Sequence, residues 1–340
     1  MKKILVTGGT GYIGSHTTVE LIKQGYQVLI IDNLCNSKKS TLDGIAKITG
    51  VMPGFFEFDL CDKEKMDNFF KEERPDAVIH FAAYKAVGES VEKPLEYYEN
   101  NLVSLLNILE MMKKYNVENL VFSSSCTVYG EPKNLPVSED APVVPANSPY
   151  GNTKQIAEEI IQDVIKANNN LNAIALRFFN PVGAHDSVLI GEVPVGAPAN
   201  LVPYITQTAI GLRDQLIVHG DDYDTADGTC IRDYVHVVDL AKAHIKAVER
   251  MINSDSEDNF EFFNLGTGQG NSVLEIIKTF EKISGEKLNY KIGPRREGDV
   301  VSVYADASKA TEVLNWKTEK NLEEMISSAW EWEKYYRGNN

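Results

Sequence analysis

A tyrosine and a lysine four residues apart are the side chains in this sequence best suited to proton transfer. Tyr150 and Lys154 lie in 148-SPYGNTK-154, where a predicted helix begins, and residues four apart share one face of a helix. A phenol has a pKa of about 10, but a neighbouring ammonium stabilises the phenolate. Such a phenolate could accept a proton from an alcohol. Taken alone, the spacing of the two residues favours a surface pair over a catalytic one.

A third candidate is Ser125, in 123-SSSCTVYG-130, which follows a predicted strand. Strands of a parallel sheet present functional side chains at their carboxyl ends. The Ser125 hydroxyl could therefore donate to the same alcohol and orient it beside Tyr150. The alternative is a serine that only caps a helix.

A glycine-rich turn near the start of the chain predicts a dinucleotide site. In 5-LVTGGTGYIG-14, Gly8, Gly11 and Gly14 stand between a predicted strand and a predicted helix. Gly8 permits the tight turn, Gly11 lets the backbone approach a pyrophosphate, and Gly14 lets helix and strand pack closely. The N–H groups that open the helix would face the phosphates. The alternative is a turn that serves packing alone.

The second predicted strand, 27-QVLIID, ends at Asp32. A carboxylate at this interval from the glycines accepts hydrogen bonds from a ribose 2′-hydroxyl and repels a 2′-phosphate. Asp32 therefore favours NAD over NADP. Lys38 and Lys39, in the loop that follows, are the residues that would instead suit NADP.

Short apolar runs alternate with amphipathic segments through the first half of the chain, a pattern typical of a parallel sheet covered by helices on both faces. Predicted strands begin near residues 3, 27, 55, 77, 119 and 173, and predicted helices span 13–24, 62–72, 94–115 and 151–167. We expect an α/β fold: a doubly wound, Rossmann-type NAD-binding domain at 1–180 and a smaller α/β substrate lobe at 181–340. Predicted helices at 237–251, 273–284 and 321–336 belong to the second lobe.

Composition narrows the classes of partner. The 340 residues are 43% hydrophobic with a net charge of −15, which disfavours nucleic acid. No apolar run suits a signal peptide or a membrane span. The four cysteines form no CxxC pair, so we expect no metal site, no disulfides and a cytoplasmic location.

Six motifs, in order, carry a family resemblance: TGGTGYIG, FSSSCTVYG, SPYGNTK, LRFFNPVGAH, GTCIRDYVHV and RREGD. They resemble the UDP-glucose 4-epimerase family of the extended short-chain dehydrogenase/reductases, over nearly the whole chain. The stretches 80-HFAAYKAVGESVEKPLEYYENN and 31-IDNLCNSKKS sharpen the resemblance from the superfamily to this family.

The resemblance implies the contacts of both ligands. NAD would meet Tyr12, Ile13, Asp32, Asn33, Asn36, Ser37, Asp59, Leu60, Phe81, Ala82, Ala83, Lys85, Asn100, Tyr150, Lys154 and Phe179. A UDP-hexose would meet Ser125, Asn180, Asn200, Leu201, His219, Arg232, Arg296, Asp299 and Val303. Arg232 and Arg296 would bind pyrophosphate oxygens as forks, which lets an acidic protein hold a dianion. Without the resemblance, the expected role of Arg232 and Arg296 would be a surface ion pair.

The implied activity is the interconversion of UDP-galactose and UDP-glucose. Tyr150 would take the C4 hydroxyl proton while NAD takes the hydride, and the 4-keto sugar would rotate and be reduced on its other face. Because no net oxidation results, we expect NAD to stay bound and to copurify with the protein.

Related chemistries remain as alternatives. The 4,6-dehydratases resemble this chain but carry an Asp-Glu pair where this sequence has Cys126 and Thr127, and elimination of water needs such an acid and base. UDP-glucuronate decarboxylases share the fold. A non-catalytic NAD-binding sensor would usually have lost Tyr150 or Lys154.

The resemblance also bears on specificity and assembly. Family members that exclude N-acetylated sugars tend to have a tyrosine at the position of Val303, so its smaller side chain predicts acceptance of UDP-N-acetylglucosamine and UDP-N-acetylgalactosamine. His219 stands where the family often has an aromatic ring near uracil, although a lone histidine is commonly structural. Helices 94–109 and 155–166 would pair across a two-fold axis in a homodimer, or their apolar stripes would only face the sheet.

Overall fold

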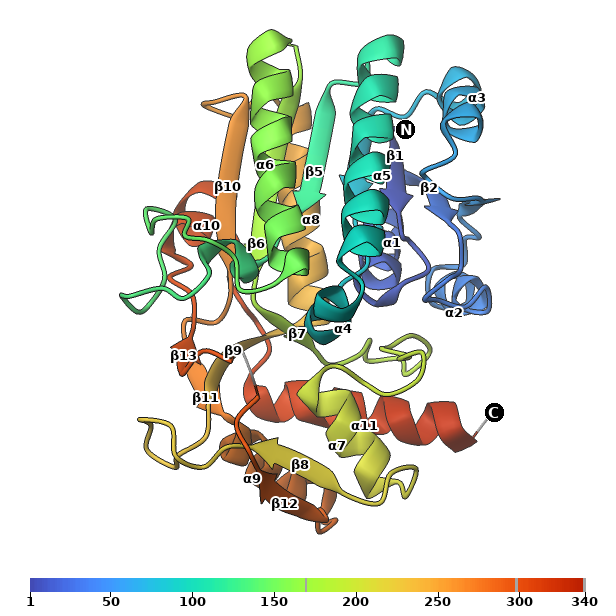
Figure 1. Ribbon diagram of the computed structural model, residues 1–340. Helices are drawn as coiled ribbons and strands as arrows, with labels where there is room; N and C mark the ends of the chain where they lie inside the picture. Colours follow the sequence, from blue (N-terminus) through green and yellow to red (C-terminus); the bar gives the residue numbers. More distant parts are fainter. Residues whose placement is uncertain (169, 297–298, 339–340) are drawn as a thin grey trace.

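The chain folds into a large parallel sheet with helices on both faces, above a smaller lobe (Figure 1). The computed structural model describes residues 1–168, 170–296 and 299–338, so Glu297 and Gly298 of the RREGD motif lie outside the described residues. The sheet has seven strands in the order β10-β6-β5-β4-β1-β2-β3, and each neighbouring pair is parallel. Its strands are β1 (Lys3–Thr7), β2 (Gln27–Asp32), β3 (Gly54–Glu57), β4 (Ala77–His80), β5 (Asn119–Ser123), β6 (Asn172–Phe178) and β10 (Phe260–Leu265). The predicted doubly wound fold is confirmed.

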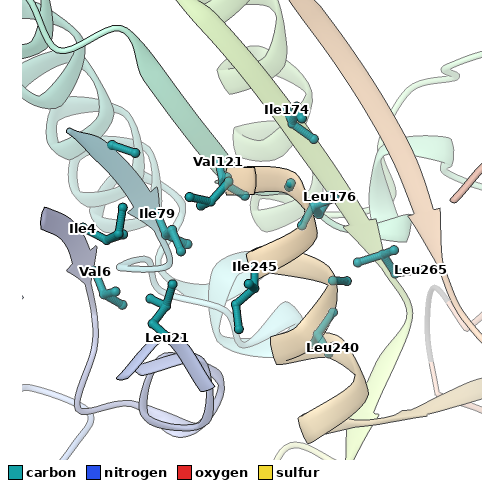
Figure 2. Packing of buried hydrophobic residues seen from close by; sticks show 14 of the residues in the cluster. Ile4, Val6, Leu21, Ile79, Val121, Ile174, Leu176, Leu240, Ile245 and Leu265 are labelled. Atoms are coloured by element: carbon teal, nitrogen blue, oxygen red, sulfur yellow. The ribbon is translucent and has the colours of Figure 1, made fainter. Parts of the chain in front are cut away.

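The strands are buried on both faces because successive side chains point to opposite sides. Ile4 and Val6 of β1 pack in one core cluster with residues of α1 (Tyr12–Lys23), α2 (Thr41–Thr49), α8 (Val237–Ile252) and α10 (Ser308–Leu314). Figure 2 shows Leu21 and Ile245 of these helices against the strands. Leu5 faces the opposite cluster, formed with α3 (Lys63–Glu73), α5 (Pro94–Tyr115) and α6 (Pro149–Ala167). Within the described ranges, no helix combines the length and apolarity needed to cross a bilayer.

The smaller lobe has its own apolar core. Its helices are α7 (Leu201–Ala209), α9 (Val273–Ser284) and α11 (Leu322–Gly338). Its strands are β7 (Asn180–Val182), β8 (Leu216–His219), β9 (Ile231–His236), β11 (Gly270–Ser272), β12 (Tyr290–Gly293) and β13 (Ser302–Val303). Two short helices, α4 (Val87–Glu92) and the 3-10 helix η1 (Cys126–Tyr129), lie after β4 and β5.

The second half of the chain also contributes to the large sheet. The sequence pattern assigns residues 181–340 to the smaller lobe, whereas β10 pairs with β6 in register from Phe260 opposite Ala173 to Leu265 opposite Phe178. Helix α8 packs beside α1 in the same core cluster. An apolar strand carries no mark of the sheet it joins, because that choice depends on pairing between distant segments.

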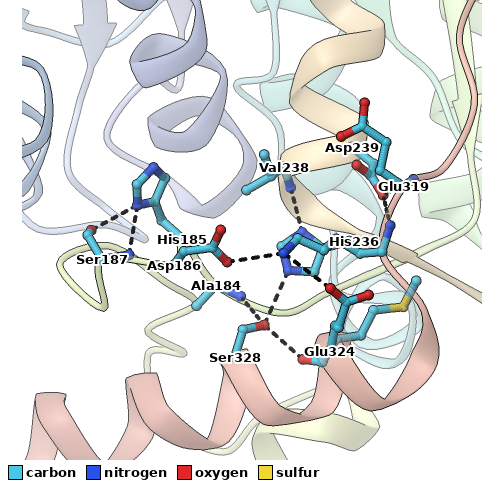
Figure 3. Close-up of polar contacts among 12 residues, drawn as sticks. Ala184, His185, Asp186, Ser187, His236, Val238, Asp239, Glu319, Glu324 and Ser328 are labelled. Atoms are coloured by element: carbon cyan, nitrogen blue, oxygen red, sulfur yellow. Dashed lines mark hydrogen bonds and ion pairs between the residues drawn. The ribbon is translucent and has the colours of Figure 1, made fainter.

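A polar network joins the two lobes at the start of α8 (Figure 3). The Val238 N–H donates to His236 Nδ1 at 3.1 Å, so Nε2 carries the proton and donates to Ser328 Oγ of α11 at 3.2 Å. The Ala184 N–H donates to the same Ser328 oxygen at 3.2 Å. Burial lowers the pKa of His236 to about 4. The neutral ring therefore acts both as the cap of α8 and as a link to α11.

Candidate active site

The glycine turn after β1 has the shape needed for a dinucleotide. Gly8 has φ +69°, and a Cβ there would stand 2.9 Å from the Ala82 nitrogen. A Cβ at Gly14 would stand 2.2 Å from the Gly8 oxygen, so only glycine lets α1 approach the turn. A Cβ at Gly11 would meet just the Gly8 oxygen, at 3.1 Å. Gly11 is the N-cap of α1 and brings no capping side chain, which leaves this helix end suited to phosphate.

Asp32 ends β2 beside this turn and is 9% exposed. Its Oδ2 accepts from the Thr10 N–H at 3.2 Å, while Oδ1 accepts from the Leu34 N–H at 2.9 Å and the Ser37 hydroxyl at 3.1 Å. A carboxylate has about four acceptor positions, so a position on Oδ2 is free for a ribose hydroxyl. The residues present therefore fit the adenosine half of NAD.

The two lysines that would suit NADP have other partners. Lys38 Nζ donates to the Tyr336 hydroxyl at 2.6 Å, and Lys39 Nζ pairs with Glu57 at 2.9 Å. Both side chains are thereby tied to neighbouring surface groups, whereas Asp32 lies at the end of the strand nearest the turn. This arrangement favours a ribose with a free 2′-hydroxyl over a 2′-phosphate.

The other predicted cofactor residues lie along the carboxyl edge of the sheet in differing surroundings. Ile13, in the first turn of α1, packs against the core, and Leu60 is buried with residues of α5. The Asn33 amide donates to Asp59 at 2.8 Å, and Phe81 contacts His244 with ring centroids 4.6 Å apart and ring planes inclined at 45°. The Tyr12 hydroxyl donates to the Gly183 carbonyl, and Asn100 lies within α5. The remaining members differ in burial: Asn36 and Lys85 are exposed, Ala82 and Ala83 are half-buried, and Phe179 is buried.

The predicted catalytic residues do meet. Pro149 opens α6, and Ser148 caps it by accepting from the Gly151 N–H at 3.1 Å, which fixes Tyr150 in the first turn. Tyr150 is 8% exposed, and burial raises its pKa to about 12, opposed by a hydrogen bond with Ser125. Lys154 donates to the Ser123 carbonyl at 2.6 Å, and burial lowers its pKa to about 8.

Lys154 makes a contact that the sequence did not predict. We expected Lys154 to stabilise the Tyr150 phenolate; its ammonium lies 5.9 Å from the Tyr150 ring centroid and also bonds to the backbone of β5. Burial outweighs the favourable contacts, so the protein groups alone raise the pKa of the phenol. Lowering it requires a further positive charge near the hydroxyl.

The predicted substrate residues surround the join between the lobes. Arg232 bonds to Asp299 at 3.1 Å, and β13 places Val303 opposite Arg232. Exposed Arg296 reaches across to α4, where a Cβ on Gly88 would stand 3.1 Å from its Nη2. Asn180 donates to the Asp233 carbonyl, and Asn200 and Leu201 lie at the start of α7. His219 is exposed, and its Nδ1 lies 3.3 Å from the Pro294 carbonyl oxygen.

Sequence reasoning missed two acidic residues of this region. Glu192 accepts from Lys85 at 3.2 Å and from Asn200 at 2.9 Å, and so links a predicted cofactor residue to a predicted substrate residue. Glu158 lies buried one turn beyond Lys154. The spacing 150, 154, 158 was a signal for Glu158, whereas Glu192 lies in a loop whose sequence gives none.

Comparison with known proteins agrees with this geometry. The family described as GDP-mannose 4,6 dehydratase matches residues 5–329. The UDP-glucose 4-epimerase of Bacillus subtilis (strain 168) is 51% identical over 330 residues, covering 97% of this chain and 96% of that protein. The solved UDP-glucose 4-epimerase of Stenotrophomonas maltophila, with bound NAD and formylated UDP-arabinopyranose, has 45% identity and a TM-score of 0.96 over 100% of both chains. That of Bifidobacterium longum, in complex with NAD+ and UDP, has 47% identity and a TM-score of 0.95 over 99% of each.

These relatives each cover at least 97% of the chain and so include both lobes. The broader match extends over both lobes and shows the extended short-chain dehydrogenase/reductase framework. The chain therefore belongs to the UDP-glucose 4-epimerase family of the extended short-chain dehydrogenase/reductases.

Proposed function

We propose that this chain interconverts UDP-galactose and UDP-glucose with tightly bound NAD. The observation that carries the proposal is the meeting of Tyr150, Ser125 and Lys154 at the carboxyl edge of the sheet that also bears the glycine turn and Asp32. Oxidation at C4, followed by reduction on the opposite face, inverts that carbon without net redox change. Family membership supports the same reaction.

Each protein group has a separate task. Tyr150 exchanges the proton of the C4 hydroxyl, and Ser125, which lies near Tyr150 and lowers its pKa, orients that hydroxyl. Lys154 is tied to the Ser123 carbonyl and keeps a positive charge within the site. When bound, NAD supplies a reversible hydride acceptor and a positively charged ring, which favours the Tyr150 phenolate.

The UDP portion is assigned to the smaller lobe. Arg232 lies at the base of the site and is paired with Asp299, while exposed Arg296 lies over α4. Both guanidiniums are always charged and match phosphate oxygens in a bidentate geometry. Pyrophosphate bound by both would span the join between the two lobes.

A 4,6-dehydratase is the main rival. Elimination needs an acid and a base near the sugar, and η1 carries Cys126 and Thr127 at the positions where the family's dehydratases have carboxylates. Burial raises the pKa of the Cys126 thiol to about 12, so it makes a poor replacement for a carboxylic acid. Epimerisation is the reaction these side chains suit.

We also propose that N-acetylated UDP-hexoses are accepted. Val303 is 7% exposed and packs with Phe179 and Tyr129 next to the predicted sugar site. A tyrosine in place of Val303 would add a ring to this cluster. The ring would reduce the room beside Arg232, which lies on β9 opposite Val303 of β13. The smaller valine leaves that room for an acetamido group.

A homodimer through α5 and α6 is a further proposal. Apolar residues on the inner faces of both helices, such as Leu105 and Ile161, pack against the sheet. On the outer side of α5, Leu106 is 47% exposed, which suits a second copy. Sedimentation velocity would decide the assembly. A cytoplasmic location is proposed from the four free cysteines.

The experiment that tests the proposed reaction uses protein purified without added cofactor. It is incubated with UDP-galactose or UDP-N-acetylgalactosamine, and the products are resolved by NMR. We expect both 4-epimers, together with NAD released on denaturation of the protein. If UDP-galactose alone reacts, the reaction stands and the wider specificity is wrong. If neither reacts after NAD is supplied, the epimerase proposal is wrong.

A further inference from the structure

Three residues on one face of α6 contact three consecutive serines at the end of β5. The helix residues are spaced by four, and each has a different type of contact with the strand. Ser125 lies close enough to Tyr150 to lower the pKa of its phenol, Lys154 Nζ donates to the Ser123 carbonyl at 2.6 Å, and the Ser124 hydroxyl donates to Glu158 Oε1 at 2.5 Å. Glu158 thus belongs to the same series as the two catalytic candidates, although it lies behind them.

Glu158 is buried, 4% exposed, and forms a bidentate ion pair with Arg177. Arg177 of β6 donates from Nε to Oε1 at 3.0 Å and from Nη2 to Oε2 at 2.6 Å. The same guanidinium donates to the Tyr129 hydroxyl at 2.9 Å, and Tyr129 donates to Asn264 at 2.7 Å. These contacts fix the carboxylate between α6, β5, β6 and η1.

The charge of Glu158 acts on Lys154. Burial lowers the pKa of Lys154, and the Glu158 carboxylate raises it. On β4, the imidazole of His80 is buried near Lys154 and is kept neutral, with its pKa lowered by burial and by the Lys154 charge. Tyr150, on the same helix, is a neutral phenol while its pKa stands near 12. Among these neighbours, Glu158 is the anionic one.

We propose that Glu158 is a positioning residue that keeps Lys154 charged and holds the segment Ser123 to Ser125 against α6. This inference rests on the catalytic roles proposed above for Lys154 and Ser125. It concerns a residue without direct access to the reacting atoms, because Ser124 and Lys154 stand between Glu158 and the site.

The direct test is the titration of Lys154 in the intact protein by NMR of ¹³Cε-labelled lysine, with its signal assigned by loss in Lys154→Arg. We expect a midpoint of about 8 in the unmodified chain. In Glu158→Gln, which keeps an acceptor for Ser124 and Arg177, the midpoint should fall by about one pH unit or more. The matched control is Glu261→Gln, which removes another bidentate ion pair, to Arg250, and should leave the midpoint unchanged. An unchanged midpoint in Glu158→Gln overturns the proposal.

The second readout is the pH profile of kcat/KM for UDP-galactose, measured with the retained NAD content and the thermal midpoint. The alkaline limb should move toward lower pH in Glu158→Gln and stay in place in Glu261→Gln. If Glu158→Gln does not fold, it is combined with Arg177→Gln, which removes both charges and leaves neither unpaired. Because loss of the Arg177 cation alone would raise the Lys154 midpoint, the double variant is compared with Arg177→Gln. Its Lys154 midpoint should lie below that of Arg177→Gln, and an equal midpoint overturns the proposal. An unmodified chain without epimerase activity would refute the proposed function, while the NMR titration would still decide the role of Glu158.

Discussion

Acid should weaken this protein through its buried histidines, and His236 gives the clearest test. The side chain is fully buried, and burial lowers its pKa to about 4. In the unfolded chain a histidine has a pKa of about 6.5, so between these values the unfolded state binds a proton that the folded state does not. The contribution of neutral His236 to stability is therefore complete above about pH 6.5 and is lost as the pH falls toward 4.

The magnitude at pH 5 depends mainly on the unfolded state, because the folded ring is still neutral there. Each pH unit below the unfolded-state pKa of about 6.5 costs about 1.4 kcal/mol. Over the roughly 1.5 units down to pH 5, the free energy of unfolding therefore falls by about 2 kcal/mol. His236→Asn keeps an acceptor for the Val238 N–H but cannot titrate. Between pH 7 and pH 5, the free energy of unfolding of His236→Asn should therefore fall less than that of the unmodified chain, by a difference of about 2 kcal/mol.

Urea unfolding of both proteins at pH 7 and pH 5 measures this difference. His219→Asn is the matched control, because His219 lies exposed on β8 and its replacement should leave the acid loss as it is. If His236→Asn loses as much stability on acidification as the unmodified chain does, the reasoning from burial is refuted.

Three further substitutions probe the site. Tyr150→Phe should lower kcat by about 10²–10⁴-fold with unchanged NAD content, measured by product NMR; near-normal turnover would contradict the assigned role. Gly14→Ala places a Cβ 2.2 Å from the Gly8 oxygen and should abolish NAD retention, whereas Gly338→Ala, with nothing within 4 Å, should not. Val303→Tyr should selectively slow UDP-N-acetylgalactosamine, and an equal loss on UDP-galactose would count against the specificity proposal.

The parts of the site that the sequence predicted are those defined by local spacing. Gly8, Gly11 and Gly14 act within one turn, and Tyr150 and Lys154 share one turn of α6, so their neighbours in sequence are also neighbours in space. The alternation of apolar runs with amphipathic segments likewise predicted the parallel sheet. In each of these cases the relevant distance along the chain is short.

The parts that escaped prediction depend on pairing between distant segments. Arg177 reaches Glu158 because β6 packs under α6, and β10 reaches the large sheet because it pairs with β6. Glu192 joins Lys85 to Asn200 through a loop between the lobes. The bond from Lys154 to the Ser123 carbonyl also escaped prediction, because it depends on how α6 lies on β5.

The burial that fixes this geometry opposes the charges that the chemistry needs. It raises the pKa of Tyr150 to about 12 and lowers that of Lys154 to about 8, so both residues are pushed toward their neutral forms. Each therefore needs a compensating charge of opposite sign: an anion near Lys154 and a cation near Tyr150. Glu158 supplies the first from within the chain, and the nicotinamide ring supplies the second when NAD is bound. Since the positively charged ring favours the phenolate, an enzyme of this design works best when NAD stays in place through every turnover.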